Sequence, residues 1–250
     1  MMRLKTMTIT KLNTRLLATA LVLWAGALVG QVREQVVSVT ALGETLPIRV
    51  FLPPDYTGNG LARFPTLYIN DGQDADAVGL SETRNRMYRE KRIAPLIVVA
   101  VPMLAERMAI YGYSDRSAGT SLPAETRYGP VGAKAHAYSE WLALNLVPEI
   151  DRQFRTIPGP EARTVLGWSL GAANAFSIGW NYPDVFGRVG AFSPSFWLSA
   201  KAGDPGTAIA PAIIAAAPGP TRMRAYFAVG SAEETDDRDG DGINDAIDDA

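Results

Sequence analysis

The pentapeptide GWSLG (167–171) places Ser169 in the pattern Gly-x-Ser-x-Gly. This pattern mounts a nucleophilic serine on a sharp turn between a strand and a helix, and its glycines leave the flanking positions free of side chains. The run RTVLGW (163–168) leads into the serine, and the alanine-rich stretch LGAANAFSIGWNY (170–182) follows it. The residues therefore predict a nucleophilic serine; the alternative is a structural serine in a tight turn.

Acyl transfer through a serine also needs donors for the negative charge that develops on the attacked carbonyl oxygen. The backbone N–H of Leu170 lies at the start of the expected helix, where the helix dipole favours an anion. A second donor is expected on the loop after an earlier central strand. The stretch YINDGQD (68–74) supplies such a loop, since Gly72 permits a tight turn and Gln73 can donate its N–H. A plain Asp-Gly turn is the alternative there.

The serine must be activated by a base, usually a histidine that a carboxylate orients. Carboxylates leave the last expected strand at Glu233, with Glu234 and Asp236 as alternatives, and the same stretch could be an acidic surface loop. The one histidine, His136, precedes the serine and is expected in a helix, in a packing or surface role. In this kind of fold the base follows the acid along the chain. We therefore expect the base beyond Ala250, in a C-terminally truncated chain.

The acidic stretch DDRDGDGINDAIDDA (236–250) contains a second pattern, typical of a twelve-residue calcium loop. Oxygen ligands at alternate positions can wrap the ion, and the glycine at position six permits a sharp bend. The expected ligands are Asp237, Asp239, Asp241, the backbone carbonyl of Ile243, Asp245 and Asp248. We expect a structural Ca²⁺ that stiffens the neighbouring acid loop, while catalysis needs no cofactor; an acidic flexible surface loop is the alternative.

The first thirty residues have the architecture of a signal peptide. A basic segment (1–15) precedes an apolar run of 15 residues (16–30), in which Ala25 and Ala27 offer a cleavage site. We expect an exported protein, periplasmic or secreted, with a signal peptide over 1–30 and a single α/β domain over 31–250 that is incomplete at its C-terminus. An uncleaved anchor is the alternative, but the apolar run is short for a membrane span, which favours export. With no cysteine, a disulfide and a lipoprotein attachment are both excluded.

The composition fits one globular domain. The chain has 250 residues, 47% of them hydrophobic, and a formal net charge of −2, which gives no reason to expect nucleic acid as a partner. Short β-rich runs alternate with helical stretches, which predicts an α/β sheet covered on both faces. We expect strands at 33–42, 46–54, 64–71, 94–103, 163–168, 188–197 and 223–234, helices at 134–154, 170–182 and 206–217, and a long loop at 108–132.

Several segments, taken in order, resemble the esterase D, or enterochelin-esterase-like, branch of the α/β-hydrolases. These are VFLPPDY, FPTLYINDGQD, IVVAVPM, LVPEIDRQFRT, VLGWSLGAANAF, YPDVFGRVGAFSPSFW and FAVGSAEE. The resemblance implies a three-layer α/β-hydrolase sandwich with a mostly parallel central sheet that lacks its last strand and helix. It also implies an esterase that forms an acyl-enzyme on Ser169, with Leu170 and Gln73 as the oxyanion hole. It favours Glu233 as the acid, three residues after Gly230.

The resemblance leaves the substrate open among siderophore lactones, feruloyl esters and other small esters, and acyl transfer to another alcohol is possible within the family. Trp180, Tyr182, Phe196 and Trp197 are expected near the cleft, although aromatic side chains there are at least as often core. Two alternatives to an active enzyme follow from the absent base: a binding or interaction protein on a hydrolase scaffold, or an inactive truncated fragment.

Overall fold

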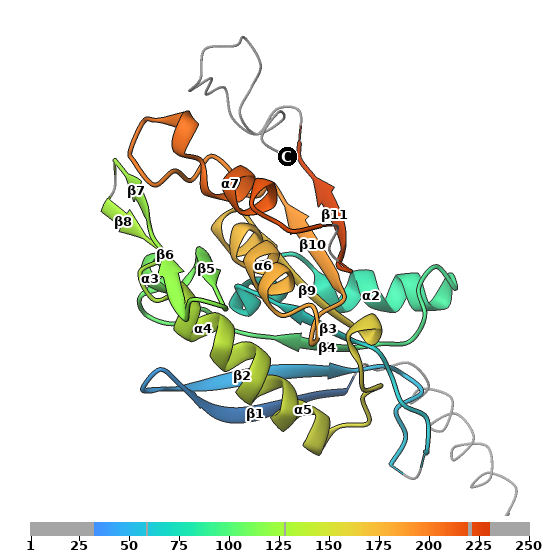
Figure 1. Cartoon of the computed structure of the whole chain (residues 1–250). Coiled ribbons are helices and arrows are strands. Elements are labelled where there is room, and N and C mark those ends of the chain that lie inside the picture. The colour runs from blue at the N-terminus through green and yellow to red at the C-terminus, as the bar shows by residue number, and fades with distance from the viewer. Residues whose placement is uncertain (1–32, 59, 128, 220–221, 231–250) are drawn as a thin grey trace, which may run out of the picture. The chain divides into compact units, whose positions relative to one another are not determined.

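The computed structural model describes residues 33–58, 60–127, 129–219 and 222–230 (Figure 1). In these residues the central sheet has seven strands in the order β1-β2-β4-β3-β9-β10-β11. The strands are β1 (Arg33–Ala41), β2 (Glu44–Leu52), β3 (Thr66–Ile69), β4 (Ile97–Ala100), β9 (Arg163–Trp168), β10 (Arg188–Phe192) and β11 (Arg224–Ala228). The expected signal peptide lies outside the described residues and stays a prediction.

The sheet is antiparallel at one side and parallel over the rest. β1 pairs with β2 and β2 with β4 in antiparallel fashion. From β4 through β3, β9 and β10 to β11 every neighbouring pair is parallel. The carboxyl ends of these parallel strands therefore meet at one edge of the sheet, where ligand sites of open α/β sheets form.

Helices cover both faces of this sheet, as the sequence predicts (Figure 1). On one face, α2 (Leu80–Arg89) packs Leu80 against a small core that includes Phe51, Ile69 and Val98. The other face carries α4 (Ala135–Trp141), α5 (Val147–Gln153), α6 (Leu170–Asn181) and α7 (Ile209–Ala215), whose buried side chains form the main core with the sheet. The expected α/β-hydrolase sandwich with a mostly parallel sheet is confirmed.

The helix expected over 134–154 forms, but in three parts. A π-helical turn (Leu142–Leu146) joins α4 to α5. Pro148 follows the π-helical turn directly, and this widened turn accommodates a residue that has no backbone N–H to donate to the preceding turn. The side chains of Tyr138, Leu142 and Ile150 on this helical stretch are fully buried.

The segment 108–132, expected as an irregular loop, contains regular structure instead. It begins within α3 (Arg107–Ile110) and holds two small antiparallel hairpins, β5 (Tyr113–Asp115) with β6 (Thr120–Leu122) and β7 (Ala124–Thr126) with β8 (Gly129–Val131). Each strand spans three residues. Such strands are too short for an alternating pattern to be visible in the sequence, which is why periodicity missed them.

Phe186 offers a test of the main core. Its side chain is 0% exposed and its ring meets that of Tyr68 edge-on, with centroids 5.4 Å apart. We expect Phe186→Ala to lower the free energy of unfolding by about 3–5 kcal/mol, because it removes buried apolar area and leaves a cavity. Leu61, 95% exposed, is the control, and Leu61→Ala should change stability by less than about 0.5 kcal/mol. Urea unfolding measures both; equal effects would contradict this core.

Candidate active site

Ser169 occupies the turn between β9 and α6 in a strained backbone conformation. β9 ends at Trp168, α6 begins at Leu170, and Ser169 between them has φ 53° and ψ −126°. A residue with a side chain rarely adopts a positive φ, and such strain often marks a functional position. The side chain is exposed. Within the described part of the chain its hydroxyl has no hydrogen-bond partner, so the group is free to react with a ligand.

The two glycines of the pentapeptide are required by close packing. A methyl group at Gly167 would overlap the carbonyl of Gly171, because α6 folds back onto the end of β9. A methyl group at Gly171 would lie 2.8 Å from Oδ2 of Asp71, on the loop after β3. The glycines thus let α6 approach both its own strand and the neighbouring loop.

The two expected oxyanion donors lie at the same edge of the sheet. β3 and β9 are parallel neighbours in which Ile69 pairs with Leu166, and Gln73 and Leu170 each follow this pair by four residues. Leu170 is the first residue of α6, and Gln73 belongs to the 3₁₀ turn η1 (Gly72–Ala75). Neither backbone N–H donates to another group of the described chain. Both are therefore available to an oxygen atom at this edge.

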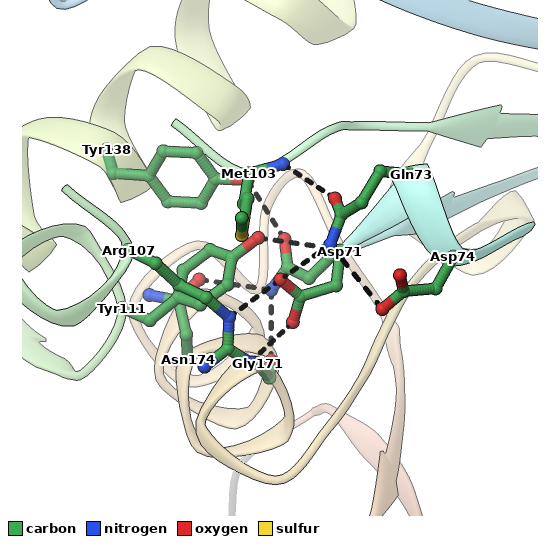
Figure 2. Close-up of polar contacts among 10 residues, drawn as sticks. Asp71, Gln73, Asp74, Met103, Arg107, Tyr111, Tyr138, Gly171 and Asn174 are labelled. Carbon is green, nitrogen blue, oxygen red and sulfur yellow. Dashed lines mark hydrogen bonds and ion pairs between the residues drawn. The ribbon is translucent and has the colours of Figure 1, made fainter. Parts of the chain in front are cut away.

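Asn70, at the carboxyl end of β3, ties the loop to α6 through a buried hydrogen-bond network. Its partners Tyr138, Gly171 and Asn174 are labelled in Figure 2. Its Nδ2 donates to the Gly171 carbonyl at 3.0 Å and to Oδ1 of Asn174 at 3.1 Å. Its Oδ1 accepts from the Tyr138 hydroxyl at 3.0 Å. Asn174 in turn donates from Nδ2 to the Gly112 carbonyl at 3.2 Å. Three hydrogen bonds donated by side-chain amides and one donated by the Tyr138 hydroxyl thus fix the loop against α4 and α6.

Asp71, the next residue, pairs with Arg107 of α3 (Figure 2). Its carboxylate accepts from Arg107 Nε at 2.8 Å and Nη2 at 2.7 Å, a bidentate arrangement. Hydrogen bonding to Asp71 raises the pKa of Arg107, which opposes the lowering by burial. The Asp71 backbone is left-handed, with φ 55° and ψ 41°, and its N–H donates to the Tyr111 hydroxyl at 3.0 Å.

Sequence reasoning identified the loop after β3 but missed the network around it. It treated the loop as a turn that presents Gln73 and assigned nothing to Asn70, Asp71 or Arg107. One signal was available: Asn174 interrupts an otherwise apolar stretch of α6, and a buried amide must find partners. The identity of those partners could not be read from spacing.

β11 also ends at this edge of the sheet. Trp168 of β9, Phe192 of β10 and Ala228 of β11 are in register. Ser169 N–H donates to the Phe192 carbonyl at 2.9 Å, and Ser193 N–H to the Ala228 carbonyl at 2.7 Å. The chain therefore leaves β11 two strands away from the serine. The expected acid Glu233, its alternatives Glu234 and Asp236, and the calcium-loop residues 237–248 follow this point and lie outside the described residues.

His136 lies away from the serine turn. It is half-buried in α4, and its backbone N–H donates to Ser121 Oγ on β6 at 3.0 Å. The paired strand β5 contacts α6 at Ser177, whose Oγ accepts from Ser114 N–H at 3.0 Å. Ser177 is eight residues beyond Ser169, about 12 Å along a helix axis. The structure thus places His136 beside the C-terminal half of α6, away from Ser169. The described residues bring no histidine to Ser169.

The aromatic residues expected near the cleft belong mostly to the core. Tyr182 and Phe196 are 1% and 6% exposed. Trp180 and Trp197 are partly buried and pack against the same core. The ring of Phe196 meets that of Phe176 at 5.2 Å between centroids. The core alternative therefore holds for Tyr182 and Phe196.

Together, the strand order, the parallel sheet and a serine on a strained turn after β9 define the α/β-hydrolase class. The family model "Esterase", described as "Putative esterase", matches residues 39–244. The chain belongs to this esterase family. Among the described residues, no helix has both the length and the apolar character that a membrane crossing requires.

The chain is also similar to curated proteins and to solved structures. The "Uncharacterized protein YjcH" of Bacillus subtilis (strain 168) is 27% identical over 166 residues, which cover 66% of this chain and 62% of that protein. A ferulic acid esterase structure has a TM-score of 0.52 at 20% identity and covers 66% of this chain and 59% of its own. The enterobactin esterase FES from Shigella flexneri, in the presence of enterobactin, has a TM-score of 0.52 at 16% identity, with 67% and 38% covered.

A further structure, the IroE-like serine hydrolase from Shewanella oneidensis, has a TM-score of 0.52 at 20% identity and covers 67% of this chain and 52% of its own. The chain thus spans less than two thirds of the length of each of these proteins. At such identities the solved structures establish the shared fold, and the earlier resemblance to the enterochelin-esterase-like branch is confirmed.

Gly167 provides a test of the serine turn. We expect Gly167→Ala to lower the free energy of unfolding by at least about 2 kcal/mol, because its methyl group overlaps backbone that cannot move without displacing α6. Gly58, which has nothing within 4 Å of an added methyl, is the matched control. Gly58→Ala should leave stability within about 0.5 kcal/mol of the parent. Chemical denaturation compares the two, and a neutral Gly167→Ala would contradict this packing.

Proposed function

We propose that this chain is a serine esterase that attacks small carboxylic esters with Ser169 and forms an acyl-enzyme. The observation that carries the proposal is the strained, exposed serine whose hydroxyl has no partner in the described chain. A nucleophile needs such an accessible hydroxyl on a sharp turn between a strand and a helix. Family membership supports ester bonds as the substrate class.

In this proposal Ser169 Oγ adds to the ester carbonyl carbon while its proton passes to a base. The carbonyl oxygen becomes an oxyanion that the N–H groups of Leu170 and Gln73 stabilise at the start of α6 and in η1. Collapse expels the alcohol, which takes up the proton, and leaves the acyl group on the serine; water then releases the acid. Fixed donors aimed at the developing charge typically contribute a factor of about 10²–10³ each.

The acid is proposed to be Glu233, because β11 ends at Ala228 in register with Trp168. The described residues bring no histidine to Ser169, so the proposal concerns the nucleophile and the oxyanion hole directly. Without a base, hydrolases of this kind retain only about 10³–10⁴-fold acceleration over water. A small external base should therefore raise the reactivity of Ser169.

The ferulic acid esterase and the enterobactin esterase with the same fold act, by their names, on esters of ferulic acid and on enterobactin. We propose small esters of this range as the substrates of the whole protein. The exposed serine at the open edge of the sheet is accessible to such molecules.

The first test is labelling with a fluorophosphonate, which phosphonylates activated serines. We expect labelling of the 250-residue chain, accelerated by added imidazole, because the small base removes the proton that no described histidine reaches. Ser169→Ala should abolish the labelling. Ser117→Ala, which removes another exposed serine hydroxyl, should leave it unchanged.

An unlabelled but folded chain, judged by circular dichroism and a cooperative thermal transition, would contradict the esterase proposal. That outcome would favour the alternative function, a binding protein on a hydrolase scaffold. Labelling that survives Ser169→Ala would place the reactive group elsewhere.

We also propose that the acidic stretch 237–248 binds a structural Ca²⁺. The support is its spacing of carboxylates at positions one, three, five, nine and twelve with Gly242 at six. These side chains repel one another unless a cation neutralises them. The stretch starts nine residues after Ala228, the end of β11, so an ion there would act on the chain that leaves the proposed active edge.

Calcium should raise the melting temperature of the chain, because an ion that binds only the folded state stabilises it. The measurement is a thermal melt in millimolar Ca²⁺ and in excess chelator, with Mg²⁺ as a matched divalent control. Asp241→Asn, which removes a central carboxylate, should reduce the calcium-dependent shift. Asp55→Asn, outside the stretch, should preserve it. Identical melts in calcium and chelator would overturn the proposal.

A further inference from the structure

Three consecutive residues before Gln73 are each fastened to a different element. Asn70 donates to the Gly171 carbonyl on α6 at 3.0 Å. Asp71 pairs with Arg107 on α3 at 2.7 Å. Gly72 donates its N–H to the Val101 carbonyl, just after β4, at 2.7 Å. The position of the Gln73 N–H therefore depends on contacts that α6, α3 and β4 supply.

Of these residues, Asp71 makes the most demanding contact. Its side chain is 2% exposed, whereas that of Arg107 is 28% exposed. A buried carboxylate is costly unless a cation and hydrogen bonds compensate it. Arg107 supplies both, because its planar fork matches the two carboxylate oxygens. The pair is thus a single unit, and removal of Arg107 leaves a buried carboxylate whose remaining side-chain donor is Gln73 Nε2 at 3.4 Å.

The Asp71 carboxylate also touches α6, the helix whose first residue, Leu170, supplies the other proposed oxyanion donor. A methyl group at Gly171 would lie 2.8 Å from Asp71 Oδ2, so the oxygen rests against the first turn of α6. Asp71 therefore lies between η1, which presents Gln73, and the first turn of α6, which presents Leu170. Its place in the fold sets the separation of the two N–H groups.

The backbone of Asp71 contributes to the same end. Its left-handed conformation turns the chain from β3 into η1, and its N–H is held by the Tyr111 hydroxyl at 3.0 Å. Tyr111 stacks under Arg107, whose guanidinium carbon is 5.2 Å from the ring centroid. Both the main chain and the side chain of Asp71 are thus fixed by the segment from Arg107 to Tyr111.

We propose that Asp71, held by Arg107, is a positioning residue of the oxyanion hole: it fixes the distance between the Gln73 and Leu170 donors. This inference rests on the proposed function of Ser169. Asp71 acts through the backbone of its neighbours and touches no reacting atom. The pair also makes the segment after β4 part of the active site, although that segment presents no group to the oxyanion.

Asp71→Asn tests the proposal with little change in shape. Asparagine adopts the left-handed conformation readily, but its amide offers one acceptor and a donor where Arg107 needs two acceptors. We expect the maximal rate of fluorophosphonate labelling (kinact) to fall at least about tenfold, because a displaced donor stabilises the oxyanion less well. The half-saturating probe concentration (KI) should stay within about twofold of the parent, since Asp71 does not contact the probe.

Arg107 variants test whether the pair acts as a unit. Arg107→Lys keeps the charge and loses the bidentate fork, so its kinact should lie between those of the parent and Asp71→Asn. Arg107→Gln should resemble Asp71→Asn. The double variant Asp71→Asn/Arg107→Gln should be no slower than either single variant, because residues of one unit have non-additive effects.

Asp151→Asn is the matched control for a lost ion pair. Asp151 pairs with Arg163, whose side chain is 9% exposed and which begins β9 at the opposite edge of the sheet from Ser169. We expect this variant to lose stability and to keep the parental kinact. All rates are measured well below each melting temperature, so that the protein is folded.

The outcomes separate this inference from the proposed function. A parent chain that is not labelled overturns the esterase proposal and the inference with it. A labelled parent with an unchanged kinact in Asp71→Asn overturns the inference alone. Equal losses of kinact in Asp71→Asn and Asp151→Asn also overturn it, because they would reveal a general effect of stability.

Discussion

The strained turn at Ser169 is the constraint on which the rest of the site depends. A positive φ at a residue with a side chain costs on the order of 1–3 kcal/mol and persists only where the surroundings enforce it. Here the Ser169 N–H is bonded to β10, and the Ser169 carbonyl accepts from Ala172 and Ala173 in α6. The strand before the serine and the helix after it are thus locked on both sides, and the serine is the residue that absorbs the strain.

Close packing of α6 against β9 has a second consequence. With no side chain at Gly171, the helix can also touch the loop after β3, and polar groups are buried between them. Such groups must be satisfied, because an unpaired buried donor or acceptor costs about 1–3 kcal/mol. Asn70 and Asp71 meet this requirement through partners on three elements. The network is therefore a result of the same close approach that the glycines permit, and it fastens the loop to α6.

The sequence was sufficient to predict the sheet and the turn, because these depend on local patterns. The buried runs gave β3, β4 and β9, and the pentapeptide located the start of α6 at Leu170. The short hairpins within 108–132 were not predicted, because three-residue strands are too short to show an alternating hydrophobic pattern. The helix α2, whose apolar positions are few, was missed for a similar reason.

The polar network could not be predicted from the sequence for a different physical reason. Its partners are far apart along the chain: Asp71 and Arg107 by 36 positions, Asn70 and Asn174 by 104. No local propensity records such a pairing, which arises only when the parallel strands bring their ends to one edge. Buried polar residues reveal that partners must exist, and the topology alone decides which they are.

The energetics of the turn bear on the choice between an enzyme and a binding protein. A scaffold kept only for binding would gain stability if the strained position held glycine, which adopts a positive φ freely. It would also gain if the free hydroxyl of Ser169 and the two free N–H groups found partners. The described structure has neither a glycine at this position nor partners for these groups: it retains a strained serine beside two unpaired donors. Strain and unpaired groups gathered at one strand edge fit acyl transfer, which needs a nucleophile beside two oxyanion donors, whereas a purely structural serine needs neither.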